Sequence, residues 1–187
     1  MRFGVIFDAC VLYPAPLRDF LIRLATAGLF MAKWTDQIHD EWTSNLLAQR
    51  PDLKEAVART RSLMNQAVPD CLVEDYEPLM EGLSLPDPDD RHVLAAAIRA
   101  GAQCIVTLNL KDFPASSLSR YGIDAVHPDA FVEQQFDLHE GVVVAVAKRH
   151  RAALLNPPKS VDEYLATLAA QGLIVTADRL SSFADVL

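Results

Sequence analysis

The sequence predicts an α/β domain with a mainly parallel central sheet, followed by C-terminal helices. Short apolar runs alternate along the chain with longer segments in which apolar residues recur at helical spacing. From about residue 138 onward no segment has the features of a strand. We therefore expect one domain over residues 1–137 and a helical extension over 138–187.

The individual elements follow from short-range patterns. Strands are predicted at the apolar runs over residues 2–7, 29–34, 72–74, 104–108 and 123–126. Helices are predicted where the apolar spacing is three or four, over residues 17–25, 36–50, 52–66, 91–100 and 129–136. Pro14 and Pro16 suit a helix start, Gly28 and Gly101 suit helix ends, and Thr35 or Asp36 can act as an N-cap. The sequence Asn156-Pro157-Pro158 should divide the extension into two or three helices.

Composition narrows the class of protein. Of the 187 residues, 51% are hydrophobic and 22% charged, which is typical of an ordered globular chain. No apolar run reaches the roughly 20 residues needed to span a bilayer, and the three cysteines have no metal-binding spacing, so we expect reduced thiols in a cytoplasmic protein. The net charge of −8 argues against a general nucleic-acid coat protein, and less strongly against a selective nuclease.

Carboxylates occur where the predicted sheet should end. Asp8 directly follows the first strand, and Asp112 comes soon after a later one. The carboxyl ends of parallel strands meet at one edge of a sheet, so both side chains should reach the same rim. Asp90 opens an apolar helix and can point back to that rim, and Glu41 is one helical turn after Ile38.

Four neighbouring carboxylates repel one another unless cations neutralise them. Oxygen ligands without a cysteine or histidine pair suit Mg²⁺ or Mn²⁺ better than zinc. Two such ions can support hydrolysis of a phosphodiester without a covalent protein intermediate. No glycine-rich phosphate loop follows the first strand, which argues against a nucleotide-binding or phosphotransfer protein.

Each carboxylate also has a structural interpretation. Asp90 or Asp89 can be a helix N-cap, Glu41 a solvated helix residue, and Asp112 part of an Asx turn. Asp8 is harder to explain in this way, because it ends a buried strand among apolar neighbours and needs a partner there.

Four segments resemble the motifs of PIN domains, in the order that the family has. The segments begin with Val5-Ile6-Phe7-Asp8-Ala9-Cys10, continue with Ile38-His39-Asp40-Glu41-Trp42 and Asp87-Pro88-Asp89-Asp90-Arg91-His92, and end with Thr107-Leu108-Asn109-Leu110-Lys111-Asp112-Phe113. Together they cover residues 1 to about 132. The extension is similar to a helical C-terminal region in a subset of the family, through Leu154-Leu155-Asn156-Pro157-Pro158 and Gln171-Gly172-Leu173.

The resemblance implies a PIN-like α/β/α sandwich and a metal-dependent endoribonuclease, with VapC-like toxins of toxin–antitoxin pairs as the best-known bacterial members. It implies that Asp8, Glu41, Asp90 and Asp112 hold Mg²⁺ or Mn²⁺ and are catalytic. Within the adjacent pair we prefer Asp90 to Asp89. The supporting residues then include Asn109, which can hold a water or phosphate, and Thr107, which can add a hydroxyl.

The implied partners are RNA, a cognate antitoxin and a second copy of the chain. Candidate RNA contacts are the basic residues Arg91, Lys111, Lys148, Arg149 and Arg151. We expect self-association because the helices at 17–25 and 53–64 carry much apolar surface. The alternatives are an RNA-processing PIN nuclease without a toxin role and a non-catalytic PIN-fold binding protein.

Overall fold

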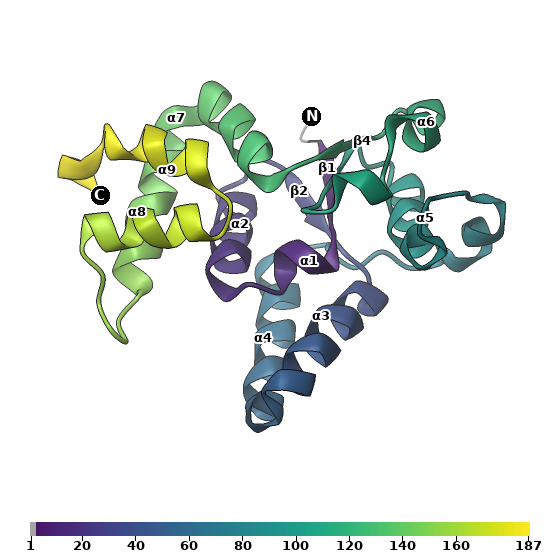
Figure 1. The fold of residues 1–187 in the computed structure, drawn as a ribbon, viewed down its shortest axis with the longest axis horizontal. Coiled ribbons are helices and arrows are strands. Elements are labelled where there is room, and N and C mark those ends of the chain that lie inside the picture. The colour runs from purple at the N-terminus through teal and green to yellow at the C-terminus, as the bar shows by residue number, and fades with distance from the viewer. Residues whose placement is uncertain (1–2) are drawn as a thin grey trace.

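The chain forms a four-stranded parallel sheet with helices on both sides, in a computed structural model that describes residues 3–187 (Figure 1). The strands are β1 (Gly4–Phe7), β2 (Met31–Lys33), β3 (Cys104–Val106) and β4 (Asp124–Val126), in the spatial order β2-β1-β3-β4. Every residue of the two central strands, β1 and β3, is buried. Strands that are covered on both faces have continuous apolar sequences, so these two strands could be predicted from the sequence. The predicted α/β class is confirmed.

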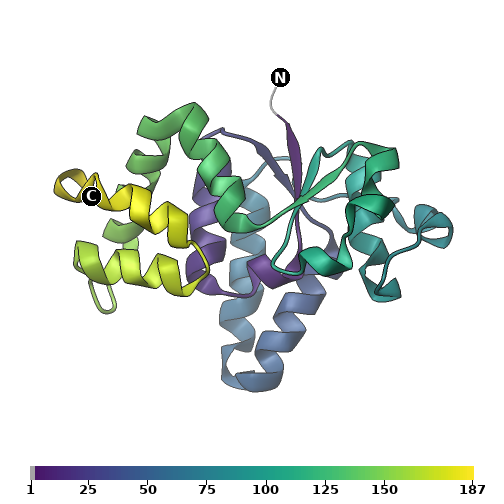
Figure 2. The same cartoon turned by 45° about the horizontal axis from the view of Figure 1, so that its top comes forward.

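Helices cover the two faces of the sheet. On one side lie α2 (Ala15–Thr26) and the long α7 (Pro128–Ala153), which pack against each other (Figures 1 and 2). On the other side lie α5 (Arg91–Ala100) and the short α6 (Ala115–Leu118). The result is an α/β/α sandwich, as predicted.

A helical hairpin lies beyond the carboxyl end of β1. The one-turn helix α1 (Ala9–Leu12) follows β1 and packs on α3 (Asp36–Gln49), which runs alongside α4 (Lys54–Ala67) (Figure 1). The Thr35 side chain accepts a hydrogen bond of 3.0 Å from the backbone N–H of Ile38 and so caps α3.

The C-terminal region is helical, as predicted. Helix α7 bends at His139, whose φ and ψ of −146° and 45° are not helical. After it come α8 (Val161–Ala170) and α9 (Ile174–Ser181), which pack on each other, and α9 also packs on α7. The break at Asn156-Pro157-Pro158 lies between α7 and α8. The predicted boundary at 137/138 falls inside α7, close to its bend.

Some local predictions need correction. Residues 72–74 form no strand: Leu72 makes one isolated bridge to Trp34, and Asp75 then turns the chain with a φ of 57°. The helix predicted over 129–136 continues to Ala153, and α1 was not predicted. Short 3-10 turns occur at Pro51–Leu53, Glu77–Gly82, Pro88–Asp90, Leu110–Asp112, Ser119–Tyr121 and Ala184–Val186. Within residues 3–187, every helix is too short or too polar to cross a membrane.

Candidate active site

A cavity of about 670 Å³ opens at the carboxyl ends of β1 and β3. Three of the four predicted carboxylates, Asp8, Glu41 and Asp90, line it. They come from the end of β1, from α3 and from the residue before α5, so three segments far apart in the sequence meet here. The other lining residues are Ala9, Cys10, Tyr13, Pro14, Trp42, Asn45, Ala48, Gln49, Leu108 and Asn109.

Asp8 is buried and held by hydrogen bonds from two neighbours. Its Oδ2 accepts one bond from the Thr107 hydroxyl at 2.7 Å and one from the Cys10 thiol at 3.1 Å. The Thr107 Oγ1 in turn accepts a bond of 3.0 Å from the backbone N–H of Asn109. A buried carboxylate requires such partners. Because these bonds occupy one oxygen, the Asp8 carboxylate is oriented by the residue that follows β3 and by Cys10 of α1.

Asp90 carries an unfavourable negative charge. Burial, and after it the negative charges of Asp8, Asp87 and Asp112, together raise the pKa of its carboxyl from the ordinary 3.8 to about 6. Although Asp90 is at the N-cap position of α5, its side chain makes no capping bond. Asp89 is exposed and is not among the residues that line the cavity.

Glu41 approaches a buried histidine. Its Oε1 lies 2.8 Å from Nε2 of His92, a side chain that is 1% exposed, at ion-pair distance but without hydrogen-bond alignment. The contact joins α3 to α5. This contact was not predicted, because nothing in the spacing of the sequence showed that these two helices would meet.

Asp112 and the basic candidates lie outside the lining of the cavity. Asp112 is half-buried on the turn after β3, close enough for its charge to raise the pKa of Asp90. Arg91 donates from Nε to the backbone oxygen of Pro88 at 2.9 Å, and Lys111 is exposed. Arg151 donates to the backbone oxygens of Leu187 and Lys159, which ties the C-terminus to α7.

Lys148 and Arg149 are exposed on the second half of α7. Arg149 lies beside Arg23 and Thr26 of α2. The cluster over residues 148–151 is therefore separate from the carboxylate cavity, because none of these four residues lines that cavity.

A family model described as "PIN domain" matches residues 4–111, which is more than half of the chain. The chain belongs to the PIN-domain family. A second model, the "VapC50 C-terminal domain", matches residues 128–182. Asp8, Glu41 and Asp90 lie within the matched PIN region, and Asp112 lies just after it.

One curated relative supports the same family. The chain is 46% identical over 82 residues to a protein of Mycobacterium tuberculosis (strain ATCC 25618 / H37Rv) named "Putative ribonuclease VapC50". The aligned stretch covers 44% of this chain and 48% of that protein, so it spans about half of the relative's length.

The PIN-domain cavity has suitable chemistry for a hard divalent cation. In this arrangement no three histidine, cysteine or carboxylate side chains within residues 3–187 group closely enough to hold one ion. Mg²⁺, however, is usually held by one or two carboxylates and several waters. Asp8 and Asp90 line the same cavity and could supply such a pair, and a cation there would offset both the burial and the carboxylate repulsion that raise the pKa of Asp90.

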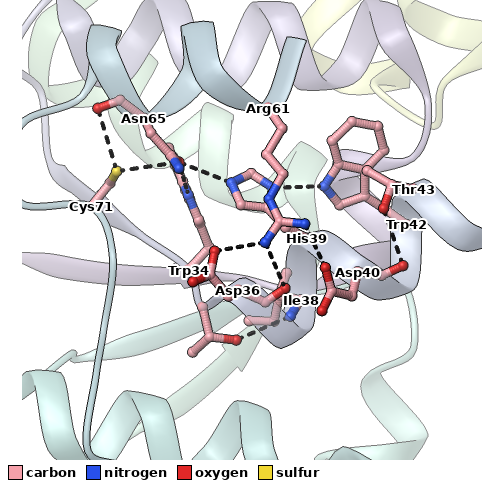
Figure 3. A network of polar contacts seen from close by, with 11 residues as sticks. Trp34, Asp36, Ile38, His39, Asp40, Trp42, Thr43, Arg61, Asn65 and Cys71 are labelled. Atoms are coloured by element: carbon pink, nitrogen blue, oxygen red, sulfur yellow. Dashed lines mark hydrogen bonds and ion pairs between the residues drawn. The ribbon is translucent and has the colours of Figure 1, made fainter. Parts of the chain in front are cut away.

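Buried polar contacts fix α3 of the PIN domain against α4. The Asn65 Oδ1 lies 2.8 Å from the Trp34 indole nitrogen and 2.9 Å from Nε2 of His39, while Nδ1 of His39 accepts a bond of 3.0 Å from the Trp42 indole (Figure 3). On the same side of α3, Arg61 pairs with Asp36 and Asp40. These contacts hold α3 on one side, so the position of its cavity-facing side is set by α4.

Three further lining residues were not predicted from the sequence: Tyr13, which is aromatic, and Asn45 and Gln49, which carry amides. Trp42, which also lines the cavity, lies in the second motif. The Arg18 guanidinium lies over the Trp42 ring, 4.6 Å from its centroid. The helical spacing of Asn45 and Gln49 after Glu41 is visible in the sequence, but only the packing of α3 shows that this side faces a cavity.

Proposed function

We propose that this protein is a metal-dependent endoribonuclease and the toxin of a toxin–antitoxin pair. The observation that carries the proposal is the meeting of Asp8, Glu41 and Asp90 in one cavity, with the pKa of Asp90 raised to about 6 by burial and by neighbouring carboxylates. An arrangement that concentrates negative charge in this way destabilises the isolated protein. A cation bound in the cavity would neutralise this negative charge, which would explain why the carboxylates are close together.

In this proposal Asp8 and Asp90 hold Mg²⁺ or Mn²⁺, with Glu41 and Asp112 completing the acidic surroundings. A bound divalent ion would polarise the scissile phosphate and lower the pKa of water. The chain's own residues orient these groups: Thr107 and Cys10 hold Oδ2 of Asp8, and His92 contacts Glu41. Asn109 lines the cavity, and we assign to it a bond to a phosphate or a water.

RNA is the proposed substrate, and the similarity to a protein named as a putative ribonuclease supports this choice. Arg91 and Lys111 are the proposed phosphate contacts, because they flank the acidic positions 90 and 112. Lys148 and Arg149 could bind RNA only at a second surface, because they lie outside the cavity. Arg151 is the weakest candidate, since its guanidinium already bonds two backbone oxygens.

The proposed partners are a cognate antitoxin and a second copy of the chain, in the cytoplasm. Leu17 and Phe20 of α2 are fully buried within the chain, so they leave no surface for self-association. Leu63 of α4 remains 52% exposed beside an apolar cavity of about 420 Å³, and it marks the surface we assign to self-association.

Cleavage of RNA tests the proposal. Purified protein should cut RNA in Mg²⁺ or Mn²⁺ and not in EDTA, and Asp8→Asn should abolish the cutting. Expression should arrest growth of a bacterial host, and co-expression of the neighbouring gene should relieve the arrest. Cleavage without growth arrest would favour an RNA-processing nuclease, and RNA binding without cleavage a non-catalytic PIN-fold protein.

A further inference from the structure

The carboxylate cavity continues along α3, away from the acidic residues. Asn45, Ala48 and Gln49 follow Glu41 by four, seven and eight positions, so all four lie on one side of the helix. At about 1.5 Å per residue, Gln49 lies roughly 12 Å along α3 from Glu41. Tyr13 and Pro14, which follow α1, also line the cavity.

This part of the cavity carries hydrogen-bonding groups but no charge. Asn45 and Gln49 are exposed, and among the described residues nothing bonds their amides or the Tyr13 hydroxyl. An amide offers both a donor and an acceptor, which is what the edge of a nucleobase requires. The half-buried ring of Tyr13 adds an aromatic surface of the kind on which bases stack.

The helix that carries the two amides is held in place from its other side. His39 contacts Asn65 of α4, and Asp36 and Asp40 both pair with Arg61 of α4 (Figure 3). The amides therefore extend from a rigid helix at a set distance from Glu41. A binding group on a rigid element discriminates between ligands better than one on a mobile loop.

We propose that this neutral part of the cavity, formed by Tyr13, Asn45, Ala48 and Gln49, is a subsite for one unpaired RNA base next to the phosphodiester that is cleaved. The proposal rests on the proposed ribonuclease function, and it adds an explanation of how the enzyme would prefer one RNA sequence over another. The volume of about 670 Å³ for the whole cavity is within the range of small-molecule sites. Only an unstacked base can present both its edge and its face to this part of the cavity, so the substrate is single-stranded at this position.

Binding of short RNAs tests the subsite. The probes are fluorescein-labelled hexaribonucleotides of A, C, G or U, together with an abasic one, and anisotropy is measured in Mg²⁺ with Asp8→Asn as the parent so that nothing is cut. We expect the parent to prefer one base. Asn45→Ala with Gln49→Ala should weaken binding of that hexamer roughly tenfold and bring the four affinities to within about twofold.

Two controls separate the subsite from general effects. Gln134→Ala removes an exposed amide on α7, outside the cavity, and should change nothing. Tyr13→Phe keeps the aromatic surface and should bind close to the parent, whereas Tyr13→Ala should bind more weakly. Because both amides are exposed, the double variant should retain the melting temperature of its parent.

The possible results distinguish the subsite from the proposed function. In a chain with Asp8 restored, the double variant should cut RNA at less selective positions. Unchanged base preference and unchanged cut sites would overturn the subsite while leaving the nuclease intact. Base-selective binding that depends on the amides, without any cleavage, would support the subsite and refute the nuclease. Binding of no hexamer, or equal binding of the abasic one, would overturn the subsite.

Discussion

Asp129, at the start of α7, accepts two hydrogen bonds from Thr176 in α9. One comes from the Thr176 backbone N–H at 2.9 Å and one from its hydroxyl at 2.8 Å, both to Oδ1. Oδ2 accepts a third bond of 2.9 Å from the backbone N–H of Val175. A carboxylate from one helix thus satisfies the N–H groups that the first turn of another leaves free.

Replacing Asp129 should therefore loosen the C-terminal helices. Asp129→Ala leaves two backbone N–H groups without their acceptor, so we expect a loss of about 2–4 kcal/mol in the free energy of unfolding. Urea denaturation measures it. Asp178→Ala, at an exposed position of α9, is the matched control and should change stability by less than about 0.5 kcal/mol. Equal effects of the two changes would show that Asp129 does not hold α9.

A divalent cation should stabilise the folded chain. Mg²⁺ or Mn²⁺ that binds only the native state raises the melting temperature, and at a hundred times its Kd it adds about 2.7 kcal/mol. Asp8→Asn should remove most of this shift, and Asp89→Asn should retain it, since Asp89 does not line the cavity. Thermal unfolding in Mg²⁺ and in EDTA measures the shift. The same shift in wild type and Asp8→Asn would refute Asp8 as a ligand.

Asp89 and Asp90 should differ in cleavage. Residues that only orient metal ligands contribute about 10- to 100-fold to metal affinity or activity, so loss of a ligand should cost more. We expect Asp90→Asn to lower the rate of RNA cleavage more than about hundredfold, and Asp89→Asn to leave it within a few-fold of wild type. Single-turnover cleavage of one labelled RNA compares them. A larger loss for Asp89→Asn would reverse the assignment.

His150 should make stability depend on pH. It is fully buried, and the pKa of its imidazole is lowered from 6.5 to about 4, chiefly by burial, with Asp19 acting to raise it and Arg23 to lower it. The unfolded chain therefore gains a proton near pH 6.5 and the folded chain only near pH 4. The stability held by neutral His150 is complete above about pH 6.5 and is lost as the pH falls toward 4, by an amount on the order of 3 kcal/mol.

Substitution can isolate this contribution. His150→Gln should flatten the fall in unfolding free energy between pH 7 and 4.5, measured by urea denaturation. It will also lower stability at pH 7, since the ring stacks on Phe20 and its Nδ1 lies 3.0 Å from the Tyr164 hydroxyl. His139→Gln, at the exposed bend of α7, should leave the slope unchanged. An unaltered slope in His150→Gln would assign the acid sensitivity to other groups.

The elements that could be predicted from the sequence are those whose ends are determined by nearby residues. Helix α5 begins and ends where expected, because Gly101 takes the left-handed conformation, with a φ of 60°, that ends it. Helix α1 was missed because four residues are too few to show a helical period. The full length of α7 was missed because its two halves were predicted as separate helices, one in the domain and one in the extension, whereas the chain only bends at His139.

The acidic residues of the site could be predicted from the sequence, but the other residues that line the cavity could not. Asp8 and Asp90 follow from strand and helix ends, which fix where a side chain lies along the chain. Asp112 was expected in the cavity, yet it lies just outside the lining, because the turn at Leu110–Asp112 sets its direction. Tyr13 and Gln49 depend on how α1 and α3 rotate against each other, which no local pattern specifies.

Helix α7 also restricts where this protein and a relative could be joined to make a folded chimaera. It begins at Pro128, where the match to the C-terminal domain model also begins, and it supplies Phe131 to the centre of the PIN sheet. The Phe131 ring lies 4.8 Å from that of Phe30 and 6.5 Å from that of Phe7, measured between centroids. A chimaera joined before Pro128 would thus take Phe7 and Phe30 from one parent and the residue that packs between them from the other. Its yield of folded protein would depend on whether a foreign residue fits between Phe7 and Phe30.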